Sequence, residues 1–189
     1  MAKLGIIAED KSDIETLRVF IKRITHERFK IKSYSAEGCG KLIRKCGKIT
    51  KIWKSERFTH VIICHDLDSN DRSKYKKLYY DLNNKTSSFP DFQNNKCILI
   101  PIEEIEAWFL SDIDCLKRIL PGLKLKEIAH PEKVSNPKEY IAKLSKKKSK
   151  PRYINTIHNP IIADSIEILK IRKKCPEFDK FYKFVIKIA

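Results

Sequence analysis

The chain has 189 residues and a mass of 22.2 kDa, which indicates one domain, and its 42% hydrophobic content is enough to build a core. Lysine and arginine number 40 against 24 acidic residues, so the formal net charge of +16 favours polyanionic partners, above all nucleic acid. No apolar run reaches the ~18 residues of a membrane span, no signal peptide precedes the first expected strand, and the six cysteines lack a zinc spacing, so we expect a cytoplasmic protein with reduced cysteines.

The first half of the sequence alternates expected strands and helices. A short buried strand over residues 4–8 leads into a helix over 12–25, which a capping box of Ser12 and Glu15 would open. We then expect an outer strand over residues 29–35 and a basic helix over 41–56. A buried strand over 60–64, which ends before Asp66, is followed by a helix over 74–82 and a fourth strand over 97–101. This alternation predicts an α/β fold with a mainly parallel sheet of about four strands, flanked by helices.

Acidic side chains follow three of these strands. Glu9 comes after the first strand, Asp66 and Asp68 after the third, and the run 103–106 opens a helix after the fourth. Parallel strands end at one edge of a sheet, where α/β proteins bind ligands. If the third strand continues through Asp66 and Asp68, both side chains leave the same face. These acids can share a site only if the first and third strands are neighbours, which predicts the strand order 2-1-3-4.

Such closely spaced carboxylates repel one another unless a cation lies between them, and a hard divalent ion such as Mg²⁺ fits this need. Each segment also has a plainer interpretation. Asp66 and Asp68 could belong to a solvated turn, and the glutamates could complement the dipole of the helix that they open. Acids at all three strand ends favour the metal site.

Basic residues gather in two segments. One face of the helix over 41–56 is apolar, and no acid interrupts the opposite face before Glu56, which favours phosphate contacts over simple solvation. A second basic run, 146–153, is followed by folded-looking chain, so we expect a loop held near the site. The candidate nucleic-acid contacts are Lys41, Arg44, Lys45, Lys48, Lys147, Lys150 and Arg152.

Glu9 with Asp13 four residues later, a helix, and a strand ending in Asp66-x-Asp68 resemble the Toprim domain. Topoisomerases, bacterial primases, recombination factors and the overcoming-lysogenization-defect (OLD) nucleases share that domain. The segments 103–112, 150–153 and 175–178 are similar to a compact, stand-alone OLD-like branch with a Glu-Ala-Trp motif. The likeness covers nearly the whole chain but departs at Asp10, where Toprim domains commonly have glycine.

The resemblance implies a Toprim or Rossmann-like core over residues 1–112 and a basic, mostly helical C-terminal extension over 113–189. It also implies a nuclease that uses one or two Mg²⁺ or Mn²⁺ ions. The implied metal ligands are Glu9, Asp13, Asp66, Asp68, Glu103 and Glu106, and the implied catalytic residues are Glu9, Asp66, Asp68 and Lys150. Glu9 could alternatively relay a proton, and Arg152 could replace Lys150 in stabilising charge on the phosphate.

Small Toprim proteins of this kind tend to be encoded beside an ABC-type or RecF-like ATPase and often serve in phage defence. The loop at 37–41 does not fit a P-loop, because Leu42 stands where a metal-binding Ser or Thr belongs, so a partner ATPase is consistent with this chain. The alternative is a non-catalytic Toprim-fold subunit that binds nucleic acid during DNA repair or processing. A phosphoacceptor receiver domain could also use Glu9, Asp10 and Asp66, but it needs a Ser or Thr where Pro101 follows the fourth strand and a Lys after a fifth strand, which we do not find. A haloacid-dehalogenase-type phosphatase places its DxD on the first strand, whereas this one follows the third.

Overall fold

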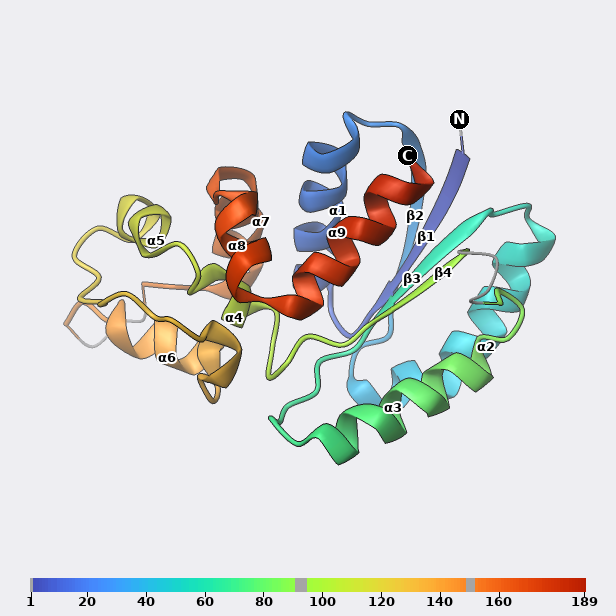
Figure 1. The fold of residues 1–189 in the computed structure, drawn as a ribbon, viewed down its shortest axis with the longest axis horizontal. Helices are drawn as coiled ribbons and strands as arrows, with labels where there is room; N and C mark the ends of the chain where they lie inside the picture. Colours follow the sequence, from blue (N-terminus) through green and yellow to red (C-terminus); the bar gives the residue numbers. More distant parts are fainter. Residues whose placement is uncertain (1, 91–94, 149–151) are drawn as a thin grey trace.

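A computed structural model describes residues 2–90, 95–148 and 152–189. The protein has an α/β fold, with helices on both faces of one sheet of four parallel strands (Figure 1). The strand order β2-β1-β3-β4 confirms the order predicted from the acidic residues. The strands are β1 (Ala2–Ala8), β2 (Phe29–Ser35), β3 (His60–Cys64) and β4 (Lys96–Leu99).

The register of the sheet aligns the carboxyl ends of its strands. Ala8 of β1 pairs with Ser35 of β2, and Cys64 of β3 pairs with Leu99 of β4, while Ile7 pairs with Ile63 across the β1–β3 step. The loops that follow β1, β3 and β4 therefore leave the same edge of the sheet. The chain reverses its direction of winding between β1 and β3, so a topological switch point lies there.

Both faces of the sheet are covered by helices. Helices α1 (Lys11–Thr25) and α9 (Pro176–Ile188) lie on one face, and α2 (Cys39–Ser55) and α3 (Arg72–Lys85) lie on the other (Figure 1). Each side has its own buried apolar cluster. Burial on both faces explains why the strands are continuous hydrophobic runs rather than alternating ones.

The capping box of α1 differs from the one that we expected. The helix begins earlier, and Asp10 accepts the backbone N–H of Asp13 at 3.0 Å while the Asp13 carboxylate accepts the backbone N–H of Asp10 at 3.3 Å. The prediction from Ser12 and Glu15 was wrong because Ser12 is buried inside the helix, where its hydroxyl accepts a hydrogen bond from Asn159. Asp10 is therefore the N-cap residue of α1, and aspartate is among the residue types favoured at that position.

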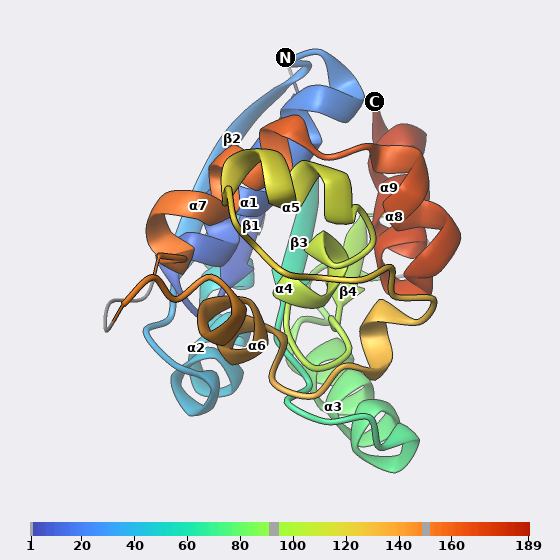
Figure 2. The same cartoon turned by 90° about the vertical axis from the view of Figure 1, so that its left-hand side faces the viewer.

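The segment after β4 forms a layer of short helices beyond the carboxyl edge of the sheet (Figure 2). The expected helix at Glu103 begins only at Glu106, because Glu103 has a left-handed backbone with φ of 59°. A later helix runs from Pro137 to Leu144. The elements of this layer are α4 (Glu106–Phe109), α5 (Ile113–Ile119), the 3₁₀ helix Pro131–Lys133, α6 (Pro137–Leu144), α7 (Asn155–Ser165) and α8 (Ile168–Lys174).

This layer shares a hydrophobic core with the sheet. The fully buried Trp108 of α4 packs against Phe20 of α1 and Phe178 of α9, with ring centroids 6.3 and 5.1 Å apart. Helix α7 packs along α1. These contacts hold the layer over the carboxyl edge, where the acidic residues lie. No helix in the described ranges is long and apolar enough to cross a membrane.

Candidate active site at the carboxyl edge

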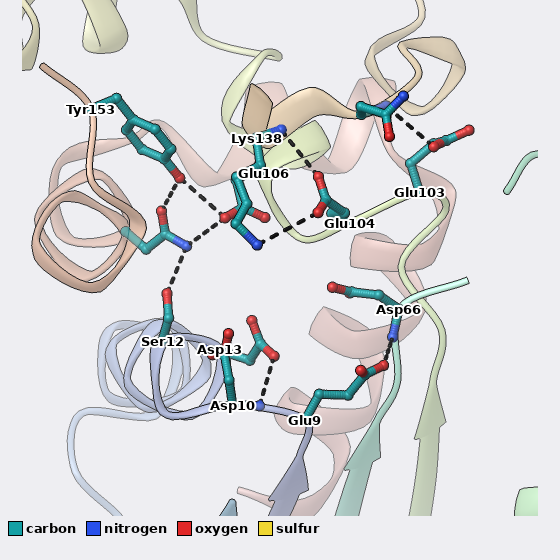
Figure 3. A network of polar contacts seen from close by, with 12 residues as sticks. Glu9, Asp10, Ser12, Asp13, Asp66, Glu103, Glu104, Glu106, Lys138 and Tyr153 are labelled. Atoms are coloured by element: carbon teal, nitrogen blue, oxygen red, sulfur yellow. Dashed lines mark hydrogen bonds and ion pairs between the residues drawn. The ribbon is translucent and has the colours of Figure 1, made fainter. Parts of the chain in front are cut away.

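Carboxylates from four segments converge at the switch point (Figure 3). Glu9 follows β1, Asp13 lies in the first turn of α1, Asp66 follows β3, and Glu104 and Glu106 follow β4. We call these five side chains the acid cluster. Their convergence depends on β1 and β3 being neighbours and on the short helix α4, which returns the chain toward α1.

Glu9 links the ends of β1 and β3. Its Oε1 accepts the backbone N–H of Asp66 at 3.1 Å and lies 3.0 Å from Nδ1 of the buried His65. Burial lowers the pKa of His65, but the hydrogen bond and the negative charge of Glu9 outweigh it, so the pKa is raised overall. A protonated His65 would balance the charge of Glu9 within the edge of the sheet.

Asp66 has the least satisfied carboxylate of the cluster. Its Oδ1 is buried and has no hydrogen-bond partner among the described residues. In Figure 3 its side chain points toward the space between Asp13, Glu104 and Glu106. Burial, followed by the charges of Asp13 and Glu106, raises the pKa of Asp66 well above the usual range. An unpaired buried carboxylate needs a proton or a cation.

Burial and neighbouring charges also raise the pKa values of two further acids of the cluster, Asp13 and Glu104. Burial raises the pKa of Asp13 well above its ordinary value, and the charges of Asp10 and Glu106 add to the effect. Burial and then the charge of Glu106 raise the pKa of Glu104 to about 7. Perturbed carboxyl groups that face one another are common in active sites.

Glu106 is held by a buried polar network that reaches the C-terminal layer. Its Oε1 accepts Asn159 Nδ2 at 3.0 Å and lies 3.1 Å from the hydroxyl of Tyr153, which also lies within hydrogen-bond distance of Asn159 Oδ1. The second hydrogen of Asn159 Nδ2 goes to Ser12 Oγ at 3.0 Å. Burial and the charge of Glu106 raise the pKa of Tyr153 far above its ordinary value, so Tyr153 remains a donor.

Lys138 is the positive side chain that lies beside Glu104. Its Nζ is 3.7 Å from Glu104 Oε1, and its backbone N–H donates to Glu104 Oε2 at 3.1 Å. Burial lowers the pKa of Lys138, but the charges of Glu106 and Glu104 outweigh burial and raise it. Helix α6 thus supplies a cation to the rim of the acid cluster.

Two of the predicted metal ligands do not belong to the acid cluster, although Asp68 lies at its rim, where burial and then the charge of Glu9 raise its pKa. Glu103 faces away, with Oε1 accepting Asn70 Nδ2 at 2.6 Å and Oε2 accepting the backbone N–H of Asn136 at 3.3 Å. Asp68 is exposed, and its backbone is left-handed with φ of 50°. Because β3 ends at Cys64 and the chain then turns, Asp66 and Asp68 do not leave one face of a strand as we expected.

The basic residues of α2 are exposed, as predicted, and the start of this helix lies next to the acid cluster. The backbone N–H of Gly38 donates to the carbonyl of Glu9 at 3.2 Å. Lys41 forms an ion pair with Glu37 at 3.6 Å, and Lys45 Nζ lies 5.9 Å from the ring centroid of Tyr34. Arg44 and Lys48 are exposed on the same helix.

The second basic segment is placed only in part. Lys147 is exposed, whereas Arg152 is half-buried and donates to the carbonyl of Pro121. Lys150, the predicted catalytic lysine, lies outside the described residues. Among the described residues of this segment, Tyr153 enters the site through its contact with Glu106.

The acid cluster fits the chemistry of a divalent cation, since its oxygen donors are crowded and Asp66 Oδ1 is unsatisfied. Over the ranges that the structure describes, no three His, Cys, Asp or Glu side chains are already grouped closely enough to hold an ion as they stand. Their mutual repulsion favours this separation, because like charges move apart when no counter-charge lies between them.

The fold and site define an α/β protein with a carboxylate-lined site at the switch point of a four-stranded parallel sheet. The family model described as "Domain of unknown function (DUF4276)" matches residues 8–186, and the chain therefore belongs to this family. No curated protein and no solved structure matches the chain significantly.

Sequence reasoning missed several residues of this site. Glu104 was not distinguished from its neighbours Glu103 and Glu106, since the direction of each side chain depends on the left-handed turn before α4. His65, Lys138 and Asn159 carry no local motif. Asn159 is fully buried inside α7, where its amide needs partners, but the sequence around it does not indicate that burial.

Proposed function

We propose that this protein is a Mg²⁺- or Mn²⁺-dependent nuclease of Toprim type that hydrolyses phosphodiester bonds in DNA or RNA. The observation that carries the proposal is the buried, unpartnered Oδ1 of Asp66, which faces Asp13, Glu104 and Glu106 at a switch point. The Toprim resemblance of the segments around Glu9 and Asp66 supports the same reaction. A purely structural role would not explain why several acids share one buried space.

The residues suited to hold the cation are Asp66, Glu9, Asp13 and Glu106, with Glu104 in place of the predicted Glu103. Asp68 is suited to the rim, where it is exposed and would contact solvent or substrate. A divalent cation bound there would supply Lewis acidity and charge neutralisation for phosphodiester hydrolysis. The oxygen-only donor set favours Mg²⁺ or Mn²⁺ over zinc.

Other side chains have roles that follow from their contacts. His65 fixes the orientation of Glu9 through the 3.0 Å contact between Nδ1 and Oε1. Tyr153 and Asn159 fix Glu106 and remain neutral donors. Lys138 brings a positive charge to the rim, where it could oppose the charge of a phosphate, and Lys150 stays a candidate for the same task.

The charge distribution supports a nucleic-acid substrate. The formal charge of the chain is +16, yet five of its 24 carboxylates lie together at the carboxyl edge, and the basic helix α2 begins beside Glu9. Lysine and arginine side chains on α2 would hold the phosphate backbone while the acid cluster acts on one phosphodiester bond. Binding should therefore weaken as the salt concentration rises.

The family resemblance adds a biological setting to the proposal. A partner ATPase of ABC or RecF type would control the nuclease, and the pair would act in phage defence. The sequence has no P-loop motif of its own, which is consistent with such a partner.

The test is cleavage of plasmid DNA and of total transfer RNA by the purified protein in Mg²⁺, Mn²⁺ or EDTA. We expect metal-dependent cutting that Asp66→Asn reduces by at least ~100-fold, because the variant removes a charge aimed at the cation. Asp114→Asn is the control, since Asp114 is 76% exposed in α5. If the wild type binds nucleic acid without cutting, with or without metal and a partner ATPase, the binding-subunit alternative replaces the nuclease.

A further inference from the structure

A groove runs along β4, the edge strand of the sheet, between α3 and α9. It consists of two neighbouring cavities of about 480 Å³ each, which share Tyr75 and Lys180 in their walls. Both volumes lie within the range of about 300–1,000 Å³ that is usual for ligand sites. Helices α3 and α9 both contact β4, which forms the floor (Figure 1). We call this feature the α3–α9 groove.

One end of the groove adjoins the loop that carries Asp66 and Asp68. Leu67 and Asn70 of that loop line the groove, and so does Ile102 from the loop after β4. Asn70 also donates to Glu103, whose carbonyl accepts the backbone N–H of Asp68 at 3.0 Å. A chain lying in the groove could therefore reach the acid cluster by crossing a single loop.

Three exposed cations border this end of the groove. They are Arg72 and Lys76 of α3 and Lys133 of the 3₁₀ helix, and none of them forms an ion pair with another described residue. Uncommitted cations around a cavity attract an anionic ligand.

The acidic groups of the groove are already engaged. Glu177 is 8% exposed and is paired with Lys180 Nζ, and the hydroxyl of Tyr75 donates to it at 3.0 Å. Asp71 caps α3 by accepting the backbone N–H of Ser73 at 2.7 Å. Burial raises the pKa of Glu132 to about 7, so this acid repels an anion less than an ordinary glutamate does. The balance of available charge is positive.

Aromatic side chains line the other end. Tyr79 lies one helical turn after Tyr75 on α3, and Phe184 faces it from α9. Tyr79 is 37% exposed, so part of its ring can receive a flat ligand. Aromatic rings beside lysines are the usual means by which proteins hold single-stranded nucleic acid, since bases stack on the rings and phosphates contact the cations.

We propose that the α3–α9 groove binds a single-stranded segment of nucleic acid adjacent to the acid cluster. The inference rests on the proposed function, because it supplies the path by which a substrate strand approaches the cluster. Cavities of this size accept separated nucleotides and exclude a double helix. Arg72, Lys76 and Lys133 contact phosphates, and Tyr79 stacks on a base.

The test measures binding in EDTA, where no cleavage occurs, by fluorescence anisotropy of labelled oligonucleotides. The ligands are a single strand of mixed sequence, in DNA and RNA forms, and a blunt DNA hairpin. The groove variant is Arg72→Gln/Lys76→Gln/Lys133→Gln. The matched control is Lys117→Gln/Lys124→Gln/Lys126→Gln, which changes the charge equally on α5 and the segment after it, far from the groove in Figure 1.

We expect the groove variant to raise the dissociation constant of the single strand by at least ~10-fold and to lower the salt slope by about 2, since each phosphate contact contributes about 0.7. The control variant and the hairpin affinity should change by less than about 2-fold. Tyr79→Ala should weaken single-strand binding by at least ~5-fold, whereas Tyr79→Phe keeps the ring and should bind normally.

Equal loss in the groove and control variants, or a groove variant that binds single strands like wild type, overturns the proposal. So does a wild-type protein that binds no single strand, as expected if the groove instead takes a peptide along β4. The cluster variant Asp66→Asn separates the two hypotheses, because it should lose cleavage in Mg²⁺ while keeping its binding in EDTA. If the groove variant binds single strands like wild type and the wild-type protein still cleaves in Mg²⁺, the groove proposal is wrong and the proposed function stands.

Discussion

Two acidic residues of the acid cluster, Asp66 and Asp13, have carboxyl groups buried where a negative charge is unfavourable. Burial raises the pKa values of Asp66 and Asp13, and the charge of Glu106 adds to the effect on both. Asp66 Oδ1 has no partner in the described part of the chain. A buried carboxylate of this kind either holds a proton or requires a positive charge. The Tyr153–Asn159–Ser12 network does not relieve this cost, because it contacts Glu106 and leaves Asp66 unsatisfied.

Glu132 gives a prediction about pH. Its pKa is raised from 4.5 to about 7, first by burial and then by the charge of Glu177. The folded state therefore binds the proton more tightly than the unfolded state, so stability falls as the pH rises from 4.5 to 7 and is constant above that. A pKa shift of this size would change the free energy of unfolding by ~3 kcal/mol between low and high pH. Because Glu132 is partly exposed to solvent, we expect a change of ~2 kcal/mol.

The measurement is the unfolding free energy from urea titrations of wild type and Glu132→Gln between pH 4 and pH 8. The two proteins should be equally stable at pH 4, and the variant should be ~2 kcal/mol more stable at pH 8. A difference that does not vary with pH would show that Glu132 titrates normally in the folded state. Glu139→Gln, at an exposed position of α6, provides the control.

At the scale of elements, α2 and α3 approach so closely that one position requires glycine. A Cβ at Gly47 of α2 would lie 2.5 Å from the backbone carbonyl oxygen of Lys85, the last residue of α3. Gly47→Ala should lower the unfolding free energy by ~1–2 kcal/mol, since the strain of overpacking exceeds the gain in helix propensity.

Gly40→Ala is the matched control in the same helix, because a Cβ there would meet only Arg44 Nη1, at 3.7 Å. It should leave stability unchanged or raise it by up to ~1 kcal/mol. Thermal and urea unfolding of both variants would test the contact. Equal effects at the two positions would contradict the close approach of α2 to α3.

The elements also show what the sequence could predict. Long apolar runs predicted the strands, and the need to bring Glu9 and Asp66 together predicted the strand order. Local turn geometry was beyond these patterns. The capping box is formed by Asp10 and Asp13 instead of Ser12 and Glu15. The left-handed backbone at Glu103 means that α4 begins only at Glu106 and that Glu103 faces away from the acid cluster.

The contributions of the C-terminal layer were less predictable for another reason. Tyr153, Asn159 and Lys138 reach the site through contacts with partners that are 34 to 147 residues away in the sequence. No periodicity or spacing encodes such contacts. The family resemblance drew attention to the segment that contains Tyr153, but it emphasised Lys150 and Arg152 instead.

The whole molecule combines a large positive charge with one concentrated group of acids. A field of this kind draws polyanions to the surface, whereas the acid cluster would repel them unless a cation neutralises it. We therefore expect the basic face of α2 to bind nucleic acid and the acid cluster, with its cation, to cleave it. Divalent cations should matter for cleavage more than for affinity.

The central claim is that a divalent cation binds in the acid cluster at Asp66. Calorimetric titration of Mn²⁺ into wild type, Asp66→Asn and Glu103→Gln tests it directly, with thermal unfolding as a check on folding. We predict binding by wild type, at least ~10-fold weaker binding by Asp66→Asn because a ligand charge is lost, and unchanged affinity for Glu103→Gln because Glu103 faces Asn70 and Asn136. Equal Mn²⁺ affinity of Asp66→Asn and wild type, or no binding by any of the folded proteins, would contradict the account.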